Sequence, residues 1–374
     1  MRVLHVFKAS LPDSYGGIEV FIDNLCREDS RLGIKNKVFT LHNDPSENAI
    51  EMGDYTVHQA KQSLFFASTG FSFSAFAKFK KLASEVDIIH YHYPNPFADL
   101  LHLVCRPQKA SLVTYHSDII KQRFLYLIYK PVEIWFLRSV DCIVTTSPNY
   151  FVSSSTLQKY SEKVTIIPIG VDAKKFANPD AKRLKNWRKI MGGPFFLFVG
   201  AMRYYKGLHL VLDAISGSNF NFAIAGINGM QNELRQKAKK MGLKNLKFLG
   251  AIEEEDKVAL LHLCAGFVFP SHLRSEAFGI SLLEAACVGK PMISCEIGTG
   301  TTFVNRADET GLVINPGSSK ELREAMDFLL ENPEIAKKLG QNAKKRALDL
   351  FSSRQQSRRY LDLYKQLIRE RNEL

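Results

Sequence analysis

The stretch "GFVFPSHLRSEAFGISLLEAACVGKPMISCE" (266–296) joins two strand patterns through a loop and a helix pattern. Its two ends, "GFVFPS" and "PMISCE", are short and mostly apolar, which favours buried strands. Gly279 disfavours a helix interior, whereas the "ISLLEAACV" that follows suits a helix and is followed by Gly289 and a proline. We therefore predict a strand, a loop through "SHLRSEAFG" and a helix that begins after Gly279. This is one unit of a parallel sheet.

The same alternation of strands and helices runs along the chain and predicts an α/β protein with parallel, doubly wound sheets. A length of 374 residues favours two domains. The pattern pauses in a polar, basic stretch after residue 172, so we predict domains at 1–172 and 173–352, followed by an amphipathic helix at 353–374. In such sheets ligands bind at the carboxyl ends of the strands, and we expect the site there and between the domains. The predicted strands are 2–7, 36–42, 86–92, 111–116, 141–147, 163–170, 195–201, 220–226, 246–251, 266–271 and 291–296.

Charge and cysteine usage narrow the class of protein. The formal net charge of +12 suggests an anionic partner: a nucleic acid, a phosphorylated ligand or an anionic membrane surface. The six cysteines form no C-x-x-C pair and mostly lie in apolar runs, which indicates reduced, buried thiols in a cytoplasmic protein. The start of the chain lacks a signal-peptide pattern, and no uncharged apolar run approaches the ~20 residues that span a bilayer.

Two carboxylates flank the glycine of the opening stretch. Glu276 should lie on the loop and Glu284 about one turn into the helix. Between them the first amides of the helix lack intrahelical acceptors, and together with the helix dipole they attract phosphate. The alternative is an ordinary strand-loop-helix crossing with two incidental carboxylates. The amides predicted to be free are those of Gly279, Ile280, Ser281 and Leu282.

A second candidate follows the predicted strand at 195–201. In "VGAMRYYKGLH", Arg203 and Lys206 place two cations at the carboxyl end of a strand, beside Gly207. This is a suitable place to hold a diphosphate. The alternative is a solvated basic turn.

Two further candidates lie in the first half of the chain. Gly16 and Gly17 separate the first strand from the first helix and would let a phosphate or sugar approach the backbone, although the alternative is a helix-start turn that needs flexible dihedrals. His116 follows a buried strand directly, where it could face a ligand or be merely structural.

His90 and His92 share a strand face, but a zinc site would need more ligands and is not expected. There is no G-x-G-x-x-G and no Asp-x-Asp pattern.

In this order and spacing the motifs resemble retaining glycosyltransferases of family 4, which have the two-Rossmann GT-B fold. The resemblance runs from Met1 to the last helix. The stretches "TYHSDI", "SPNYF", "RYYKGLH", "FPSHLRSEAFGISLLE" and "EIGTGT" are similar to bacterial lipopolysaccharide mannosyl- and rhamnosyltransferases.

The resemblance implies GDP-mannose or GDP-D-rhamnose as donor and an undecaprenyl-diphosphate-linked saccharide as acceptor, at the inner face of the cytoplasmic membrane. It also implies that no metal or other cofactor is needed and that the C-terminal helix packs back on the N-terminal domain. The implied catalytic residues are Glu276, which contacts hydroxyls of the transferred sugar, and His116, which lies beside that sugar. The implied binding residues are Glu284 for the ribose, Arg203, Lys206 and the amides of Gly279, Ile280 and Ser281 for the diphosphate, and Gly16 and Gly17 for the acceptor and phosphate side.

One departure from the family pattern concerns the diphosphate. Much of the family has an arginine directly after the glycine of the strand, here Gly200, but this chain has Ala201 there and an arginine two residues later. Lys206 keeps its register. The expectation of diphosphate contact is therefore stronger for Lys206 than for Arg203.

Two basic, phenylalanine-rich segments suggest a membrane surface. Residues 61–85, with Lys78, Lys80 and Lys81, and residues 119–138, with Lys121, Arg123 and Lys130, are predicted as surface helices. Such helices suit an anionic interface, and the alternative is core-facing aromatics with a solvated basic face.

Four other functions remain compatible with the sequence. They are a nucleotide-sugar epimerase or phosphorylase of the same fold, a UDP-sugar-dependent transferase, a non-enzymatic sugar-nucleotide sensor, and a nucleic-acid-binding protein. No recognition motif supports the last of these.

Overall fold

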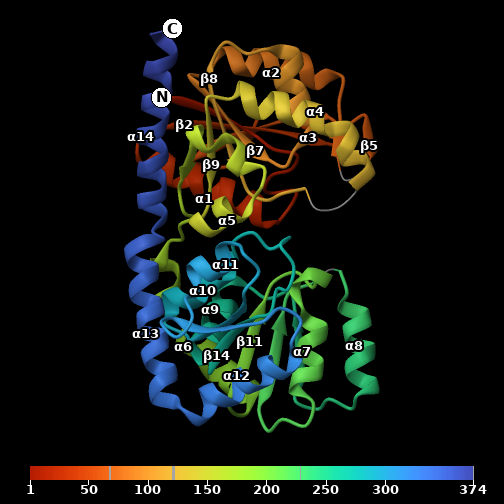
Figure 1. Cartoon of the computed structure of the whole chain (residues 1–374), viewed down its shortest axis with the longest axis vertical. Helices are drawn as coiled ribbons and strands as arrows, with labels where there is room; N and C mark the ends of the chain where they lie inside the picture. Colours follow the sequence, from red (N-terminus) through yellow and green to blue (C-terminus); the bar gives the residue numbers. More distant parts are fainter. Residues whose placement is uncertain (67–68, 120–122, 228, 374) are drawn as a thin grey trace. The chain divides into compact units, whose positions relative to one another are not determined.

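The computed structural model describes residues 1–66, 69–119, 123–227 and 229–373. The chain divides into two compact units (Figure 1). Unit 1 contains Met1–Gly170 and Ser353–Leu374, and unit 2 contains Val171–Ser352. The division lies two residues before the boundary placed at 172, and the chain returns to unit 1 at the start of its last helix.

Unit 1 is built on a sheet in the order β10-β9-β8-β7-β1-β2-β4-β3. Every neighbouring pair is parallel except β3 and β4, as the alternating sequence pattern predicts. A separate antiparallel hairpin joins β5 to β6. The strands are β1 (Arg2–Val6), β2 (Lys35–His42), β3 (Ile50–Glu51), β4 (Tyr55–Lys61), β5 (Leu64–Phe66), β6 (Thr69–Phe71), β7 (Ile88–Tyr93), β8 (Ala110–Tyr115), β9 (Cys142–Thr145) and β10 (Val164–Ile166).

The helices of unit 1 form two groups. Helices α2, α3 and α4 pack side by side, and α1 packs against α14 (Figure 1). Their bounds are α1 (Gly17–Arg31), α2 (Ser74–Ser84), α3 (Pro96–Cys105), α4 (Arg123–Ser139), α5 (Pro148–Ser153) and α14 (Ser353–Asn372), with the 3₁₀ segment η1 (Leu157–Lys163).

The last helix, α14, has the amphipathic face that its sequence predicts. Its apolar residues at spacings of three and four are all buried in unit 1. The Tyr364 hydroxyl bonds to His90 Nδ1 at 2.7 Å, and the Tyr360 hydroxyl bonds to Thr114 Oγ1 at 2.9 Å. The buried residues of this face are Tyr360, Leu363, Tyr364 and Leu367.

The predicted surface helix at 61–85 is wrong in its first half. Residues 64–66 and 69–71 form the β5–β6 hairpin, and the helix begins only at Ser74. The apolar residues of 64–66 are all exposed, which suits a hairpin that protrudes from the main sheet. The second segment is a helix, α4, as predicted. Lys121 lies outside the described residues.

Unit 2 has a parallel sheet in the order β13-β12-β11-β14-β15-β16. Its strands are β11 (Phe195–Val199), β12 (Asn221–Ala225), β13 (Leu246–Gly250), β14 (Gly266–Phe269), β15 (Met292–Cys295) and β16 (Gly311–Ile314). Its helices are α6 (Ala181–Met191), α7 (Leu208–Ile215), α8 (Gln231–Lys240), α9 (Glu254–Leu263), α10 (Ile280–Val288), α11 (Gly300–Val304), α12 (Ser319–Glu331) and α13 (Pro333–Leu350), with the 3₁₀ turns η2 (Ala173–Phe176) and η3 (Tyr204–Lys206).

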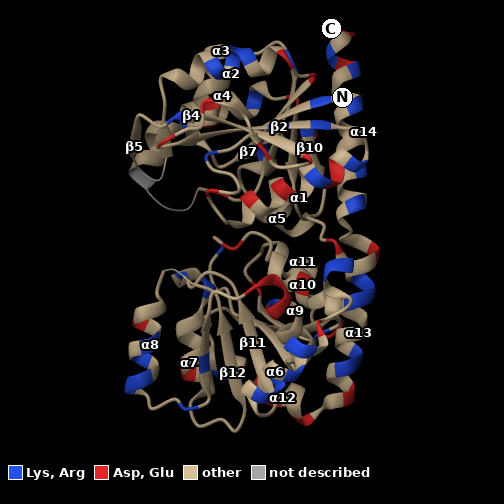
Figure 2. Cartoon of the chain, turned by 180° about the vertical axis from the view of Figure 1, so that it is seen from behind, with Lys and Arg blue, Asp and Glu red and all other residues tan. Residues whose placement is uncertain are grey.

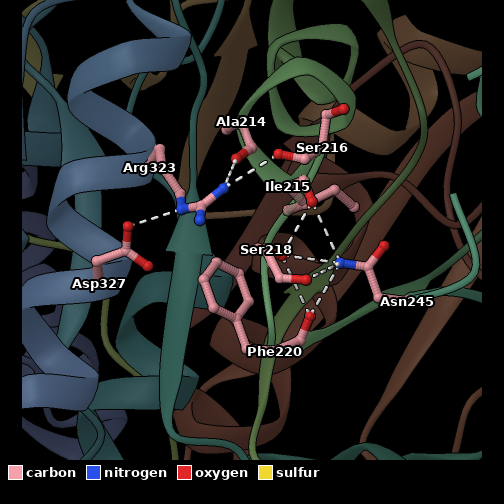
Figure 3. A network of polar contacts seen from close by, with 8 residues as sticks. All are labelled: Ala214, Ile215, Ser216, Ser218, Phe220, Asn245, Arg323 and Asp327. Carbon is pink, nitrogen blue, oxygen red and sulfur yellow. Dashed lines mark hydrogen bonds and ion pairs between the residues drawn. The ribbon is translucent and has the colours of Figure 1, made fainter.

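Side chains fix the far end of α7, where the last helical carbonyls lack intrahelical partners. Figure 3 shows Arg323 of α12 donating to the carbonyl oxygens of Ala214 and Ser216, each at 3.2 Å. The amide of Asn245 donates to the carbonyl of Ile215 at 3.2 Å. Because α7 starts directly after η3, this network helps to hold the helix that supports the predicted basic loop.

Candidate donor site

The crossing from β14 to α10 has the form that its sequence predicts. The loop runs from Pro270 to Gly279, and α10 begins at Ile280. Gly279 has φ of +87°, a left-handed conformation that favours glycine, and an added Cβ would lie 3.0 Å from Phe269 Cε1. The helix ends at Gly289, again with positive φ. Gly279 therefore separates loop from helix, as predicted.

Three of the four predicted amides are free at the start of α10. Within the described chain, the amides of Gly279, Ile280 and Ser281 have no acceptor. The prediction for Leu282 is wrong, because its amide donates to the Gly279 carbonyl at 2.9 Å and closes the first turn. Three donors at a helix N-terminus remain, in the arrangement that attracts phosphate.

Lys206 and Glu276, which are 70 residues apart in sequence, form an ion pair. Their side chains keep only 13% and 11% of their surface exposed, and Ser271 Oγ donates to Glu276 Oε2 at 3.3 Å. The Lys206 ammonium lies 4.5 Å from the centre of the Phe269 ring, the same ring that Gly279 approaches. One aromatic ring thus connects the buried cation to the start of α10.

The sheet order explains this pairing. β11 and β14 are neighbours and parallel, so the loops after their carboxyl ends lie at the same edge of the sheet. Lys206 ends η3 in the first loop, and Glu276 lies in the second. An amide of the second loop, that of His272, donates to the Tyr205 carbonyl at 2.9 Å and ties the loops together.

Arg203 and Glu284 are placed differently from this pair. Arg203 is exposed, and its guanidinium has no partner among the residues that the structure describes. Glu284 lies in α10 and pairs with Lys257 of α9 at 2.7 Å. Burial raises the pKa of Glu284, and the Lys257 ammonium partly opposes this rise. Sequence reasoning missed Lys257 and Ser271, because nothing in their local patterns marks them.

The paired glycines of unit 1 stand at the start of α1. Gly16 has extended dihedrals, so it does not need the conformational freedom of glycine. A Cβ there would overlap the Glu19 carboxylate, whose Oε1 accepts a hydrogen bond from Ser14 Oγ at 3.0 Å. Gly16 therefore makes room for a carboxylate beside the N-terminus of its own helix. Gly17 has open space at its Cβ position.

His116 is buried at the end of β8, within a group of four histidines. Its Nε2 lies 3.1 Å from His92 Nδ1, and the Phe21 ring packs edge-on at 4.9 Å between centroids. Burial lowers the pKa of His116 to about 3, so the ring is neutral at pH 7. His116 is therefore not the isolated residue that its sequence context suggests.

Two family models match this chain, and relatives match it along nearly its whole length. The model for glycosyl transferases group 1 covers residues 180–346, and that for glycosyltransferase family 4 covers residues 15–175. The chain is 50% identical to the D-rhamnosyltransferase WbpZ of Pseudomonas aeruginosa, over 94% of this chain and 93% of that protein. It is 46% identical to the O-antigen chain mannosyltransferase C of Escherichia coli, over the whole of both. The chain belongs to glycosyltransferase family 4.

Solved structures show that this family 4 glycosyltransferase has the GT-B fold. Sucrose-phosphate synthase from Thermosynechococcus elongatus has a TM-score of 0.82, with 22% identity and 99% of each chain covered. Anabaena HepE in complex with UDP has a TM-score of 0.78, with 18% identity over 98% of this chain and all of that one. At such identities the likeness concerns the fold alone.

The tight approach at Gly207 gives a direct test of how the family 4 loop holds Lys206. Gly207 has φ of +71°, and a Cβ there would overlap the Pro270 carbonyl oxygen. Gly192 has the same φ with nothing near its Cβ position, so Gly192→Ala measures the dihedral strain alone. We expect Gly207→Ala to lower the free energy of unfolding of unit 2 by about 3 kcal/mol more than Gly192→Ala.

Urea unfolding followed by Trp187 fluorescence, in a Trp135→Phe background, measures this difference because Trp187 lies in unit 2. The transferase activity of Gly207→Ala should fall as well, since Lys206 precedes the displaced glycine. Equal losses of stability in the two variants would contradict this account of the loop.

Proposed function

We propose that this glycosyltransferase retains anomeric configuration and moves mannose or D-rhamnose from a GDP-sugar to a polyprenyl-diphosphate-linked saccharide in lipopolysaccharide O-polysaccharide biosynthesis. The observation that supports it most is the buried Lys206–Glu276 pair beside three free amides of α10. The choice of sugars rests on the two relatives, whose names specify D-rhamnosyl and mannosyl transfer.

In this proposal unit 2 holds the donor. The Lys206 ammonium and the amides of Gly279, Ile280 and Ser281 face the diphosphate, where negative charge grows as the leaving group departs. The Glu276 carboxylate accepts hydrogen bonds from hydroxyls of the transferred sugar, and the Glu284 carboxylate accepts those of the ribose. The Arg203 guanidinium is a second, more exposed cation for the diphosphate.

The reaction exchanges one bond to the anomeric carbon for another. The bond to the diphosphate oxygen breaks, the acceptor hydroxyl bonds on the same face, and its proton passes to the departing phosphate. No carboxylate nucleophile is required by this route. We expect no metal requirement, because a cation and three amides supply the positive potential, and excess EDTA should leave the rate unchanged.

A panel of nucleotide sugars tests the donor. The protein is incubated with GDP-mannose, GDP-D-rhamnose, UDP-glucose or UDP-N-acetylglucosamine and a lipid-diphosphate disaccharide, and the nucleotide released is measured. We expect release from a GDP-sugar and only when the acceptor is present. New sugar products without acceptor would indicate an epimerase, and turnover of a UDP-sugar alone would overturn the donor assignment.

We further propose that unit 1 contacts an anionic membrane surface through the β5 strand and its neighbours. Leu64, Phe65 and Phe66 are each more than 60% exposed, and Phe73 is 81% exposed. Lys80 and Lys81 are exposed on α2, the helix that follows the hairpin in sequence, and Figure 2 shows the basic residues of α2. Apolar side chains next to cations suit the boundary between headgroups and acyl chains.

Two of the lysines predicted for this surface are not fully exposed. Lys78 donates to the Gln59 carbonyl at 2.6 Å. Contrary to the prediction, its ammonium is therefore bound within unit 1. On α4, Lys130 is half-buried, whereas the apolar Leu127 and Ile128 are well exposed. None of the helices in the described part of the chain is long and apolar enough to cross a bilayer.

Vesicle binding tests the membrane contact. The variant Phe65→Ser/Phe66→Ser should bind vesicles of phosphatidylglycerol and phosphatidylcholine about tenfold more weakly than the wild type, because two large side chains leave the bilayer boundary. The matched control is Ile335→Ser/Leu348→Ser, which removes exposed apolar residues from α13 of unit 2. Equal flotation of all three proteins would contradict the proposal.

The net charge does not favour a nucleic-acid-binding protein. Lys and Arg residues are spread over helices of both units, among them α2, α8, α13 and α14 (Figure 2). Such a spread differs from the single basic patch or stripe of a nucleic-acid interface.

A further inference from the structure

Four buried histidines come together on neighbouring strands of unit 1. His5 lies on β1 opposite His90 of β7, and His92 is two residues further along β7. His116 directly follows β8, the next strand of the sheet. The sheet order β8-β7-β1 therefore assembles a group that is scattered in the sequence.

Hydrogen bonds divide this group into two branches. One branch is a chain of three rings: His116 Nε2 lies 3.1 Å from His92 Nδ1, and His92 Nε2 lies 3.1 Å from His5 Nδ1. The chain ends at Asn36, whose Oδ1 lies 3.3 Å from His5 Nε2. His90 forms the other branch, with Tyr364 at Nδ1 and Thr114 at Nε2, each at 2.7 Å.

Asn36 gives the first branch a direction. Its amide Nδ2 donates to the Cys26 carbonyl at 3.3 Å, which leaves the oxygen Oδ1 facing His5. An amide oxygen only accepts, so His5 must carry its proton on Nε2. All three rings are neutral at pH 7, because burial lowers the pKa of His5 to about 4, that of His116 to about 3, and that of His92 well below its ordinary value.

A neutral imidazole has one donor and one acceptor, so each ring passes the constraint to the next. With its proton on Nε2, His5 accepts at Nδ1 and requires His92 to donate from Nε2. His92 then accepts at Nδ1 and requires His116 to donate from Nε2. This leaves His116 Nδ1 as a bare lone pair. Within the described residues that nitrogen has no hydrogen-bond partner. It is not completely shielded from solvent, so a ligand can reach it.

We propose that Asn36, acting through His5 and His92, fixes the tautomer of His116 so that its Nδ1 can only accept a hydrogen bond. The ligand class for this nitrogen is a hydroxyl donor. That this hydroxyl belongs to a sugar substrate rests on the function proposed above. Asn36, His5 and His92 are positioning residues, and a sugar derivative without the matching hydroxyl would lose this contact.

A buried metal site explains the cluster less well. Ring nitrogens of His5, His90 and His92 lie within 4.8 Å of one another. Both nitrogens of His90 already have hydroxyl partners at 2.7 Å, however, and all three rings are almost completely buried without a carboxylate ligand in the group. A dication there would break the existing bonds and lose its hydration.

The test reads the tautomer by nitrogen NMR of the ¹⁵N-histidine-labelled full chain without substrate, with His116→Gln identifying the resonances. The wild type should show His116 protonated on Nε2. Asn36→Leu removes the acceptor, so the proton positions should reverse along the chain and His116 should become protonated on Nδ1. His5→Phe breaks the chain one link later and should have the same effect if Asn36→Leu folds poorly.

Thr114→Val is the matched control, since Thr114 is equally buried but belongs to the His90 branch. It should keep the wild-type tautomer and about the wild-type kcat, whereas Asn36→Leu should lower kcat/KM about tenfold or more. A wild-type His116 tautomer in both Asn36→Leu and His5→Phe would overturn the inference, as would a stoichiometric metal in the purified protein. Because the tautomer is measured without substrate, failure of the proposed function would leave this result standing.

Discussion

Replacing Lys206 by methionine is expected to lower kcat about 10³-fold, because a buried cation next to the start of α10 is lost from the position where the leaving group gains charge. A methionine side chain is nearly as long as that of lysine, so the packing on Phe269 is largely kept. Steady-state transfer to a lipid-linked acceptor measures the effect. Lys237→Met, which removes a half-exposed lysine of the same unit, should change kcat less than threefold.

The stability of the Lys206 variants separates catalysis from folding. Lys206→Met alone leaves the Glu276 carboxylate buried without its counter-charge, which should cost about 3 kcal/mol. The double variant Lys206→Met/Glu276→Gln removes both charges and should recover most of the stability while remaining inactive. A double variant that recovers activity together with stability would contradict a catalytic role for the pair.

The second large effect is a steep loss of stability of unit 1 in mild acid. Burial lowers the folded-state pKa of five histidines well below 6.5, so below pH 6.5 the unfolded chain binds protons that the folded chain does not. The stability that the neutral histidines contribute is fully present above pH 6.5 and is lost as the pH falls towards their folded-state pKa values. The five are His5, His90, His92, His102 and His116.

Two buried carboxyl groups act in the opposite direction. Burial raises the pKa of Asp29 to about 7 and that of Asp99 well above its ordinary value. The folded chain therefore holds protons on these groups that the unfolded chain releases above pH 4, so their contribution declines as the pH rises. Five histidines against two carboxyls give a net proton difference that is near zero at pH 7 and grows to about three at pH 5, so the average is about half of three and the loss between these pH values is about 4 kcal/mol.

Urea unfolding from pH 8 to pH 5, followed by Trp135 fluorescence in a Trp187→Phe variant, measures this loss in unit 1. Asp29→Asn is a control for the sign. It should be more stable than the wild type at pH 8, where Asp29 is charged, and equal to it at pH 4, where the buried carboxyl is neutral. A stability of unit 1 that is flat between pH 7 and pH 5 would contradict the assignment of neutral buried histidines.

The sequence correctly predicted those features of the fold that depend on residues close together in the chain. The break at Gly279 and the buried face of α14 followed from glycine chemistry and from helical spacing. The strand β4, "YTVHQAK", was not predicted because its polar and apolar residues alternate only loosely. The strand β16 was not predicted because it has only four residues. In residues 61–73 the many phenylalanines suggested one amphipathic helix, whereas the hairpin exposes Phe65 and Phe66 on β5.

Contacts that depend on strand order could not be predicted from local patterns. The Lys206–Glu276 pair forms because β11 lies next to β14, with β12 and β13 on the other side of β11. The histidine chain forms because β1 lies between β2 and β7, which places Asn36 and His92 on either side of His5. The sequence marked Lys206, Glu276 and His116 as separate candidates, and the sheet order supplies their partners.

The linkage of the transferred sugar tests the central claim most directly. The protein is given GDP-mannose or GDP-D-rhamnose and a lipid-diphosphate saccharide, and the anomeric configuration of the product is determined by NMR. The account predicts a new α-glycosidic bond from an α-configured GDP-sugar, formed by wild-type protein and lost in Lys206→Met. A β-linked product, or no transfer from either GDP-sugar under conditions where a UDP-sugar is consumed, would contradict it.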